Sequence, residues 1–258
     1  MIIEGSVAIV TGGASGLGEA TSTALAARGA HVVIADLNEE RGNALAASLH
    51  GTFVKTDVAD TASVRAMVEA AAAAGSLRIL VNCAGVGWPG RTIGKDGQFE
   101  SAFNLDVFRK VIEINLIGSF DVLRHAATVM STQEPNHDGE RGVIVNTASV
   151  AAFDGQIGQA AYSASKGGVV GMTLPIARDL SVSGIRVNTI APGLIDTPIY
   201  GSGEASEQFK ERLSKDLLFP RRLGGADEFA RLAIELVENG YMNAETIRID
   251  GGIRMGPK

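Results

Sequence analysis

Short runs of consecutive apolar residues recur along the chain, separated by longer stretches with a helical pattern. Most of the short runs are apolar throughout rather than alternating, which is typical of parallel strands covered on both faces. The pattern therefore predicts buried strands. They span residues 7–10, 32–35, 52–55, 79–82, 142–146, 186–190 and 246–249.

The stretches between these runs are largely alanine-rich and predict helices. Strands that alternate with helices are typical of a parallel sheet with helices on both sides. Because crossovers between parallel strands are right-handed, we expect an α/β doubly wound fold. The chain carries no internal repeat and no linker, so we expect a single domain over residues 1–258. The predicted helices span residues 16–28, 38–49, 61–74, 106–131, 161–182, 204–214 and 226–238.

Two longer segments are predicted to be loops that frame a substrate. Residues 86–105 are rich in glycine and carry Trp88 and Pro89, and residues 193–220 mix proline, glycine and apolar residues around one helical patch. Long loops at the carboxyl ends of the strands usually build the site in such folds. We expect the second segment to order over a bound ligand as a mobile lid.

Composition narrows the classes of function. With 45% hydrophobic and 20% charged residues the chain is expected to fold, and its net charge of −6 argues against a nucleic-acid partner. We find no apolar run of the roughly 20 residues that a membrane span needs. The single cysteine excludes an intrachain disulfide and a multi-cysteine zinc site, and we predict no metal site. A strand pattern begins almost at the first residue, so the expected location is cytoplasmic.

A glycine-rich turn joins the first predicted strand to the first predicted helix. The residues TGGASGLG place Gly12, Gly16 and Gly18 in this turn. Glycines allow the backbone to approach a pyrophosphate closely, and a helix N-terminus offers free N–H groups to it. A glycine-rich turn alone is a weak signal, but its position between strand and helix favours a dinucleotide site.

Asp36 ends the second predicted strand, 24 residues after Gly12. A carboxylate at this point can accept hydrogen bonds from both hydroxyls of a ribose and repels a 2′-phosphate. Leu37 and Asn38 follow, so no basic residue stands ready for that phosphate. The sequence therefore favours NAD over NADP. The alternative is that Asp36 caps the next helix.

Two later strand ends carry further candidates for the cofactor. Asp57 follows the third strand and could accept a hydrogen bond from an adenine amino group, or could simply be a turn residue. The residues NCAG follow the fourth strand, where Gly85 would let the main chain run beside a ribose. Cys83 is interpreted as a small buried residue rather than a nucleophile, because no basic partner beside it would lower its pKa.

Candidate catalytic residues lie in the second half of the chain. Tyr162 and Lys166 are four residues apart and share a helix face, and Ser149 ends the fifth predicted strand. We expect the ammonium, together with the positive nicotinamide, to lower the pKa of Tyr162 from its free value of about 10. Tyr162 can then exchange a proton with an alcohol or carbonyl oxygen that Ser149 also contacts.

Asn115 is a polar residue within an apolar predicted helix, VIEINLIGSF, and it needs hydrogen-bond partners there. It could cap a distorted helical turn. It could instead hold a water molecule that links Lys166 to solvent as a path for protons.

These motifs together resemble those of the short-chain dehydrogenase/reductase family, and the resemblance covers essentially the whole chain. It implies a seven-stranded parallel Rossmann sheet, hydride exchange between a nicotinamide and a secondary alcohol or ketone, and a homotetramer. It further implies that Asn115, Ser149, Tyr162 and Lys166 form a catalytic tetrad. Thr197 would hold the nicotinamide carboxamide.

Residues 141–180 resemble, more specifically, the family's dehydrogenases of 3-hydroxyacyl-CoA thioesters. This implies NAD-linked oxidation of (S)-3-hydroxyacyl-CoA to 3-ketoacyl-CoA, with Gln156 in the substrate pocket beside Ser149 and Tyr162. The chain departs from this pattern at Ile195-Asp196, where Phe-Gly is expected, and in residues 86–105 and 201–216. By position, the residues implied to bind NAD are Gly12, Ser15, Leu17, Gly18, Asp36, Asp57, Val58, Cys83, Gly85, Tyr162, Lys166, Pro192, Ile195 and Thr197.

Two other functions compete with this hypothesis. One is a different alcohol or ketone oxidoreductase of the same fold, such as a hydroxysteroid dehydrogenase or a 3-ketoacyl reductase, and Asp36 weighs against the NADPH-dependent reductase. The other is a cofactor-binding scaffold without turnover, against which Ser149, Tyr162 and Lys166 weigh.

Overall fold

Seven parallel strands form the centre of the computed structural model, which describes residues 1–198, 201 and 203–257. Their order across the sheet is β3-β2-β1-β4-β5-β6-β9. The predicted α/β doubly wound fold is confirmed, and so is each predicted strand. The strands are β1 (Val7–Thr11), β2 (His31–Asp36), β3 (Thr52–Lys55), β4 (Leu77–Asn82), β5 (Gly142–Thr147), β6 (Ile185–Pro192) and β9 (Thr246–Ile249).

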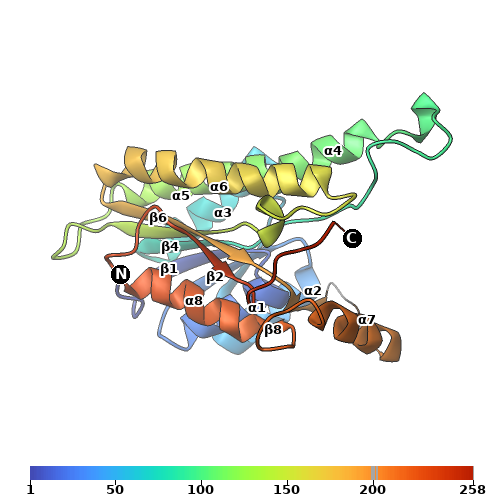
Figure 1. Cartoon of the computed structure of the whole chain (residues 1–258). Coiled ribbons are helices and arrows are strands. Elements are labelled where there is room, and N and C mark those ends of the chain that lie inside the picture. The colour runs from blue at the N-terminus through green and yellow to red at the C-terminus, as the bar shows by residue number, and fades with distance from the viewer. Residues whose placement is uncertain (199–200, 202, 258) are drawn as a thin grey trace.

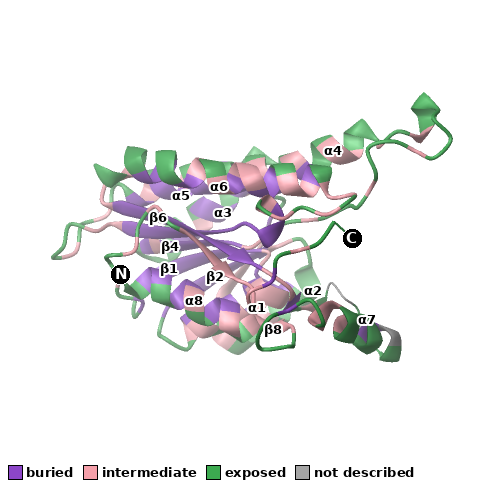
Figure 2. Cartoon of the chain, in the orientation of Figure 1, coloured by how far each residue is buried: buried purple, intermediate pink, exposed green. Residues whose placement is uncertain are grey.

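The uninterrupted apolar runs form strands because both faces of the sheet are covered. Along β1, Val7 and Ile9 pack into one buried cluster, whereas Ala8 and Val10 pack into another on the opposite face. The strands at the centre of the sheet are accordingly buried along most of their length (Figure 2).

The helices form two layers around the sheet. Helices α1, α2 and α8 cover one face, and α3, α5 and α6 cover the other (Figure 1). No helix among the described residues combines the length and the apolar character that crossing a bilayer requires. The helices are α1 (Gly16–Ala26), α2 (Glu39–Leu49), α3 (Thr61–Ala74), α4 (Leu105–Ile112), α5 (Ser119–Met130), α6 (Ala160–Ser181), α7 (Glu204–Ser214) and α8 (Ala226–Glu238).

The helix predicted over residues 106–131 is interrupted in the structure. A π-helical turn, Glu113–Gly118, separates α4 from α5. Within it, the carbonyl oxygen of Asn115 accepts a hydrogen bond from Ser119 Oγ at 2.7 Å. Wide turns of this kind inside helices often occur at functional sites. The turn lies at the end of the sheet that carries the candidate site.

The two predicted substrate loops lie outside the layers. Residues 86–105 project from the body of the molecule before α4 (Figure 1). The segment 193–220 contains α7, as predicted, and a short strand β7 (Ile195–Asp196) that pairs in parallel with β8 (Gly224–Gly225). Residues 199, 200 and 202 of this segment lie outside the described residues.

The order of the strands reverses between β1 and β4. From β1 the chain builds outward to β2 and β3, and it then returns to the other side of β1 as β4. In open α/β sheets ligands bind in the crevice at the carboxyl ends of the strands beside such a reversal.

Candidate active site

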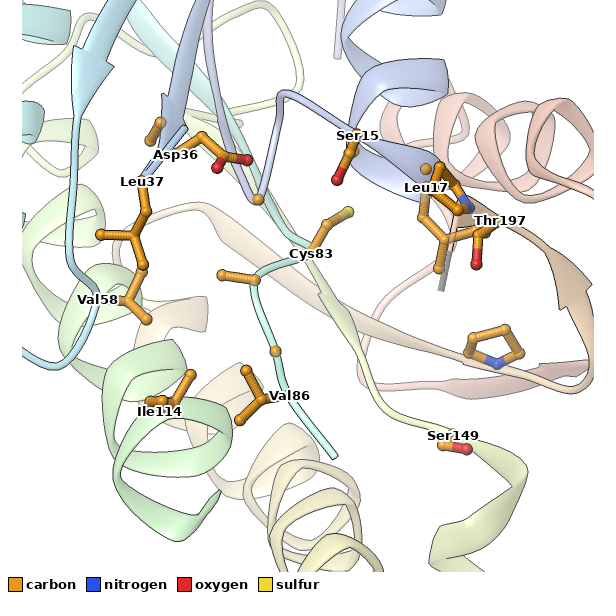
Figure 3. Close-up of a pocket in the computed structure, with 18 of the residues that line it drawn as sticks. Ser15, Leu17, Asp36, Leu37, Val58, Cys83, Val86, Ile114, Ser149 and Thr197 are labelled. Atoms are coloured by element: carbon orange, nitrogen blue, oxygen red, sulfur yellow. The ribbon is translucent and has the colours of Figure 1, made fainter. Parts of the chain in front are cut away.

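A cavity of about 450 Å³ opens at this point, over the carboxyl ends of the strands (Figure 3). It gathers residues from both halves of the chain, which the sequence alone places far apart. The predicted residues that line it are Gly12, Ser15, Leu17, Gly18, Asp36, Asp57, Val58, Cys83, Gly85, Ser149, Tyr162, Pro192, Ile195 and Thr197.

The glycine-rich turn between β1 and α1 forms part of the floor of the cavity. Gly12 has a φ of +60°, and a Cβ atom there would lie 2.9 Å from the main chain of Ala84. A Cβ atom at Gly18 would overlap the carbonyl oxygen of Gly12. These two positions therefore require glycine, because the turn and the neighbouring strand end leave no space for a side chain.

The N-terminus of α1 opens into the same cavity. Its first helical hydrogen bond runs from Glu19 N to Ser15 O at 3.1 Å, so the N–H groups before Glu19 have no hydrogen-bond partner within the helix. Gly16, Leu17 and Gly18 line the cavity at this point. A glycine cradle with free N–H groups and a positive dipole end suits a pyrophosphate.

Asp36 lies at the end of β2 and is fixed by two hydrogen bonds. Its Oδ2 accepts from Ala14 N and its Oδ1 from Asn38 N, each at 3.0 Å. The N-cap of α2 is Asn38, whose side chain accepts from Arg41 N, so the alternative of Asp36 as the helix cap is wrong. The carboxylate is thus placed at the cavity wall, next to the glycine-rich turn (Figure 3). This setting suits the ribose of an NAD molecule.

The adjacent wall combines Asp57 with apolar residues. Asp57 Oδ1 accepts from Ala59 N at 2.9 Å, so this side chain is a turn residue as well as a lining residue. Leu37, Val58 and Ile114 face the same part of the cavity (Figure 3). A flat apolar group such as an adenine fits between side chains of this kind.

Several residues that line the cavity were not predicted from the sequence. Some directly follow predicted strands, a position that could have identified them. Ile114 could not be found in this way, because it reaches the cavity from the π-helical turn. The missed residues are Ala35, Leu37, Thr56, Ala84, Val86, Ile114, Gly193 and Pro198.

Ser149 and Tyr162 meet at the other end of the cavity. Ser149 follows β5, and its Oγ accepts from Ala151 N at 3.1 Å. Burial raises the pKa of the Tyr162 phenol, and a hydrogen bond with the Ser149 side chain opposes that rise. The two hydroxyls are therefore close enough to contact one substrate oxygen.

Lys166 lies one helical turn after Tyr162 and is buried. Its Nζ donates to Thr147 O at 2.7 Å and stands 5.9 Å from the centroid of the Tyr162 ring. Burial lowers the pKa of Lys166 to about 8. In the cofactor-free protein burial is the largest effect on the phenol, so its pKa lies above its usual value. The predicted lowering, which needs the positive nicotinamide beside the ammonium, stays a prediction.

Asn115 sits fully buried behind this pair. Its Oδ1 accepts from Val86 N and its Nδ2 donates to Val86 O, both at 2.8 Å, and Nδ2 also donates to Ser165 Oγ at 3.0 Å. A Cβ atom on Gly85 would lie 3.3 Å from Asn115 Oδ1 and 3.4 Å from Lys166 Nζ. The distorted turn is confirmed, whereas the water link to Lys166 stays a prediction.

Cys83 lines the middle of the cavity (Figure 3). Burial raises the pKa of its thiol to about 11, although Thr147 and Lys166 act in the opposite direction. The neutral thiol fits the interpretation of Cys83 as a small packing residue.

Gln156 does not reach the cavity. It lines a separate surface groove with Arg91 and Ile93, and its Nε2 donates to Gly256 O at 3.1 Å. The structure therefore does not bring Gln156 together with Ser149 and Tyr162, because its side chain is held by the C-terminal segment. Its role in substrate binding stays a prediction.

Comparisons of the sequence and of the structure with known proteins all find dehydrogenases. Residues 6–208 match the sequence model of a family described as short chain dehydrogenase. The chain is 51% identical to the 3-hydroxyacyl-CoA dehydrogenase type-2 of Drosophila melanogaster, over 99% of this chain and 100% of that protein. It is 48% identical to the Homo sapiens protein of the same name, over 99% and 97%. A crystal structure of 3-hydroxyacyl-CoA dehydrogenase type-2 from Mycobacterium avium superimposes with a TM-score of 0.92 at 47% identity, covering 98% of each chain.

Proposed function

The chain belongs to the short-chain dehydrogenase family, and from this premise we propose that it oxidises (S)-3-hydroxyacyl-CoA thioesters reversibly to 3-ketoacyl-CoA with NAD. Membership of the family confirms the prediction of a dehydrogenase that uses NAD(H) and acts on a small molecule. One observation carries the proposal: a cavity has the Ser149 and Tyr162 hydroxyls at one end and Asp36 with a glycine cradle at the other.

The cofactor would occupy the length of this cavity. The turn from Gly12 to Gly18 would hold the pyrophosphate, with contacts from Ser15 and Leu17. Asp36 would accept from a ribose, and Asp57 and Val58 would contact the adenine. Further contacts are assigned to Cys83, Gly85, Tyr162, Lys166, Pro192, Ile195 and Thr197. When bound, NAD⁺ supplies the acceptor for a hydride that leaves the hydroxyl-bearing carbon of the substrate.

The proton chemistry belongs to side chains of the chain. Tyr162 would take the proton of the substrate hydroxyl, and Ser149 would hold the same oxygen by a hydrogen bond. Lys166, as an ammonium beneath the ring, would favour the phenolate that this step needs. Asn115 would complete a path for the proton through a water molecule next to Lys166.

The chain is assigned one catalytic domain, residues 1–258, in which the loops 86–105 and 193–220 bind the substrate. Gln156 is assigned to substrate binding as well, from the groove beside the first loop. Pro198, Thr197 and Ile195 of the second loop line the cavity, which supports this assignment. Ile195-Asp196 replaces the Phe-Gly of the resembled enzymes at this wall, so the preferred acyl chain is expected to differ from theirs.

The chain is also proposed to form a homotetramer in the cytoplasm. Ile117 and Phe120 are about half-exposed around the start of α5, and Leu174 is similarly exposed on the neighbouring helix α6. Burial of such side chains against another copy is favourable. A single, free cysteine, Cys83, suits a reducing compartment. Light scattering of the purified protein measures the number of subunits.

The test is a substrate panel followed through the absorbance of NADH. Acetoacetyl-CoA, a simple acetoacetate ester and a 17-ketosteroid are each supplied with NADH and, separately, with NADPH. Rapid oxidation of NADH with the thioester alone supports the proposal. Turnover only with the steroid or the ester overturns the assigned substrate. NADH binding without turnover of any of the three favours the alternative of a cofactor-binding scaffold.

The matched variant is Tyr162→Phe, which removes one hydroxyl and keeps the ring. We expect kcat to fall by at least about 100-fold, because the acid–base group is lost. A variant with unchanged kcat would exclude the mechanism.

A further inference from the structure

The segment between Ser149 and Tyr162 is held by parts of the chain that lie far from it in sequence. Residues 150–161 lead from β5 to α6 and set the separation of the two hydroxyls. Gln159, the N-cap of α6, uses its Oε1 to accept from Gln156 N at 3.0 Å, so it faces the loop rather than the helix. The position of Tyr162 therefore depends on how this segment is fixed.

Arg248 of β9 is the main link to that segment. Its Nη2 donates to Asp154 Oδ2 and its Nε to Asp250 Oδ2, each at 2.6 Å. Nη2 also donates to Ile253 O at 2.9 Å, and the guanidinium lies 5.4 Å from the centroid of the Phe153 ring. The planar fork of arginine suits two carboxylates at once in a way that a lysine cannot reproduce.

This cluster is shielded from solvent. The side chains of Arg248, Asp154 and Asp250 are 21%, 18% and 9% exposed. Charge-assisted hydrogen bonds in such a setting are stronger than surface ion pairs. Removing only one partner destabilises the fold, because the other charge is left buried and unpaired. Arg248 also holds the pKa of the Asp154 carboxyl below its usual value, chiefly by hydrogen bonding.

The C-terminal segment continues the contact beyond Arg248. Ile157 N donates to Pro257 O at 3.0 Å, and Gln156 Nε2 donates to Gly256 O. Figure 1 shows the C-terminus on the same side of the molecule as the start of α6. Residues 250–257 thus pack along one side of the segment that precedes Tyr162.

A small hydrophobic cluster joins the same parts. Ile253 packs with Val150, the residue after Ser149, and with Leu217 after α7, and all three are almost fully buried. A displacement of the C-terminal segment would therefore reach Ser149 through Val150 and Tyr162 through the loop.

We propose that Arg248 is a positioning residue, which acts through Asp154 and residues 250–257 to hold the Ser149 and Tyr162 hydroxyls at the separation that one substrate oxygen requires. The proposal rests on the proposed function for these two hydroxyls. It concerns the geometry of the loop and not the identity of the substrate. A displacement of about 1 Å at such a site can cost up to 100-fold in rate.

The experiment compares Arg248→Met, Arg248→Lys and Asp154→Asn with the unaltered protein. We expect kcat for acetoacetyl-CoA reduction to fall by about tenfold or more in Arg248→Met and Asp154→Asn, with KM for NADH within about twofold. Arg248→Lys should recover little, since it lacks the fork. In the double variant Arg248→Met/Asp154→Asn the losses should not add, because the two groups act as one unit.

The matched control is Arg254→Met. Arg254 also contacts Asp250, at 3.2 Å, but its side chain is 66% exposed. We expect its kcat to stay within about twofold of the unaltered protein. A decrease in Arg254→Met equal to that in Arg248→Met would overturn the proposal, and so would an unchanged kcat in Asp154→Asn. Asp154→Asn decides the question if Arg248→Met does not fold.

Hydrogen exchange followed by mass spectrometry separates this proposal from the assignment of the substrate. In Arg248→Met we expect faster exchange of backbone amides in residues 150–161 and unchanged exchange in residues 7–36. This holds with no substrate present. Unchanged exchange in residues 150–161 would refute the positioning role even if acetoacetyl-CoA is turned over. If the unaltered protein does not turn over acetoacetyl-CoA, that result would refute the proposed function instead.

Discussion

Replacement of Lys166 by methionine should make the protein more stable while it abolishes the reaction. Burial lowers the pKa of Lys166 from 10.5 to about 8. Each pKa unit corresponds to about 1.4 kcal/mol, so the buried charge costs about 3 kcal/mol of folding free energy at neutral pH. Loss of the hydrogen bond to Thr147 O offsets about 1 kcal/mol of this gain. A net gain of about 2 kcal/mol raises Tm by roughly 4–8 °C in a domain of this size.

The direction of the pH dependence follows from the same pKa. The native lysine loses its proton as pH rises through about 8, whereas the unfolded chain keeps it until about 10.5. The unaltered protein therefore gains stability over this interval and Lys166→Met does not. The difference in Tm should be largest at pH 7 and should shrink at pH 9.

Scanning calorimetry of the cofactor-free protein at these two pH values measures the effect. The control is Lys55→Met, at a lysine whose side chain is 61% exposed, for which the change in stability should stay within about 0.5 kcal/mol. A lower Tm in Lys166→Met, or a difference that is the same at pH 7 and pH 9, would refute the reasoning.

Two further predictions concern the cofactor. Asp36→Ala should lower the ratio of kcat/KM for NADH over NADPH by about 10- to 100-fold, since the charged hydrogen bonds proposed between Asp36 and a ribose would be lost; an unchanged ratio would exclude that role. Gly18→Ala should weaken NADH binding by at least about tenfold in a fluorescence titration, because its Cβ would displace Gly12 O. Gly240→Ala, at an exposed turn, is its control, and equal affinities in the two variants would contradict the cradle.

Much of the fold follows from local patterns in the sequence. The run VAIV at residues 7–10 predicts the strand β1, because a strand can be apolar at consecutive positions when both faces of the sheet are covered. Gly12 and Gly18 mark the turn after it, and Asp36 marks the end of the next strand. Because parallel strands end at one edge of the sheet, such residues converge in space without any further information.

Other features depend on contacts that no local pattern encodes. The π-helical turn exists where Asn115 binds the main chain of Val86, a partner 29 residues away. The pKa of Tyr162 reflects how deeply the phenol is buried, which outweighs its hydrogen bond with Ser149. Gln156 lies outside the cavity because Gly256 holds it, and that contact spans 100 residues.

The π-helical turn also changes the phase of the helices that it joins. An α-helix rotates by roughly 100° per residue, so one additional residue in a turn rotates everything that follows by about that angle. Helix α4 accordingly packs against α6, whereas α5 packs against α3 and β4. The helices α4 and α5 thus continue one another but direct their apolar faces to different neighbours. The helical repeat of apolar residues before Asn115 does not continue in phase after it. A deletion of one residue in Glu113–Gly118 would restore a regular helix and turn one of those faces away from its neighbours.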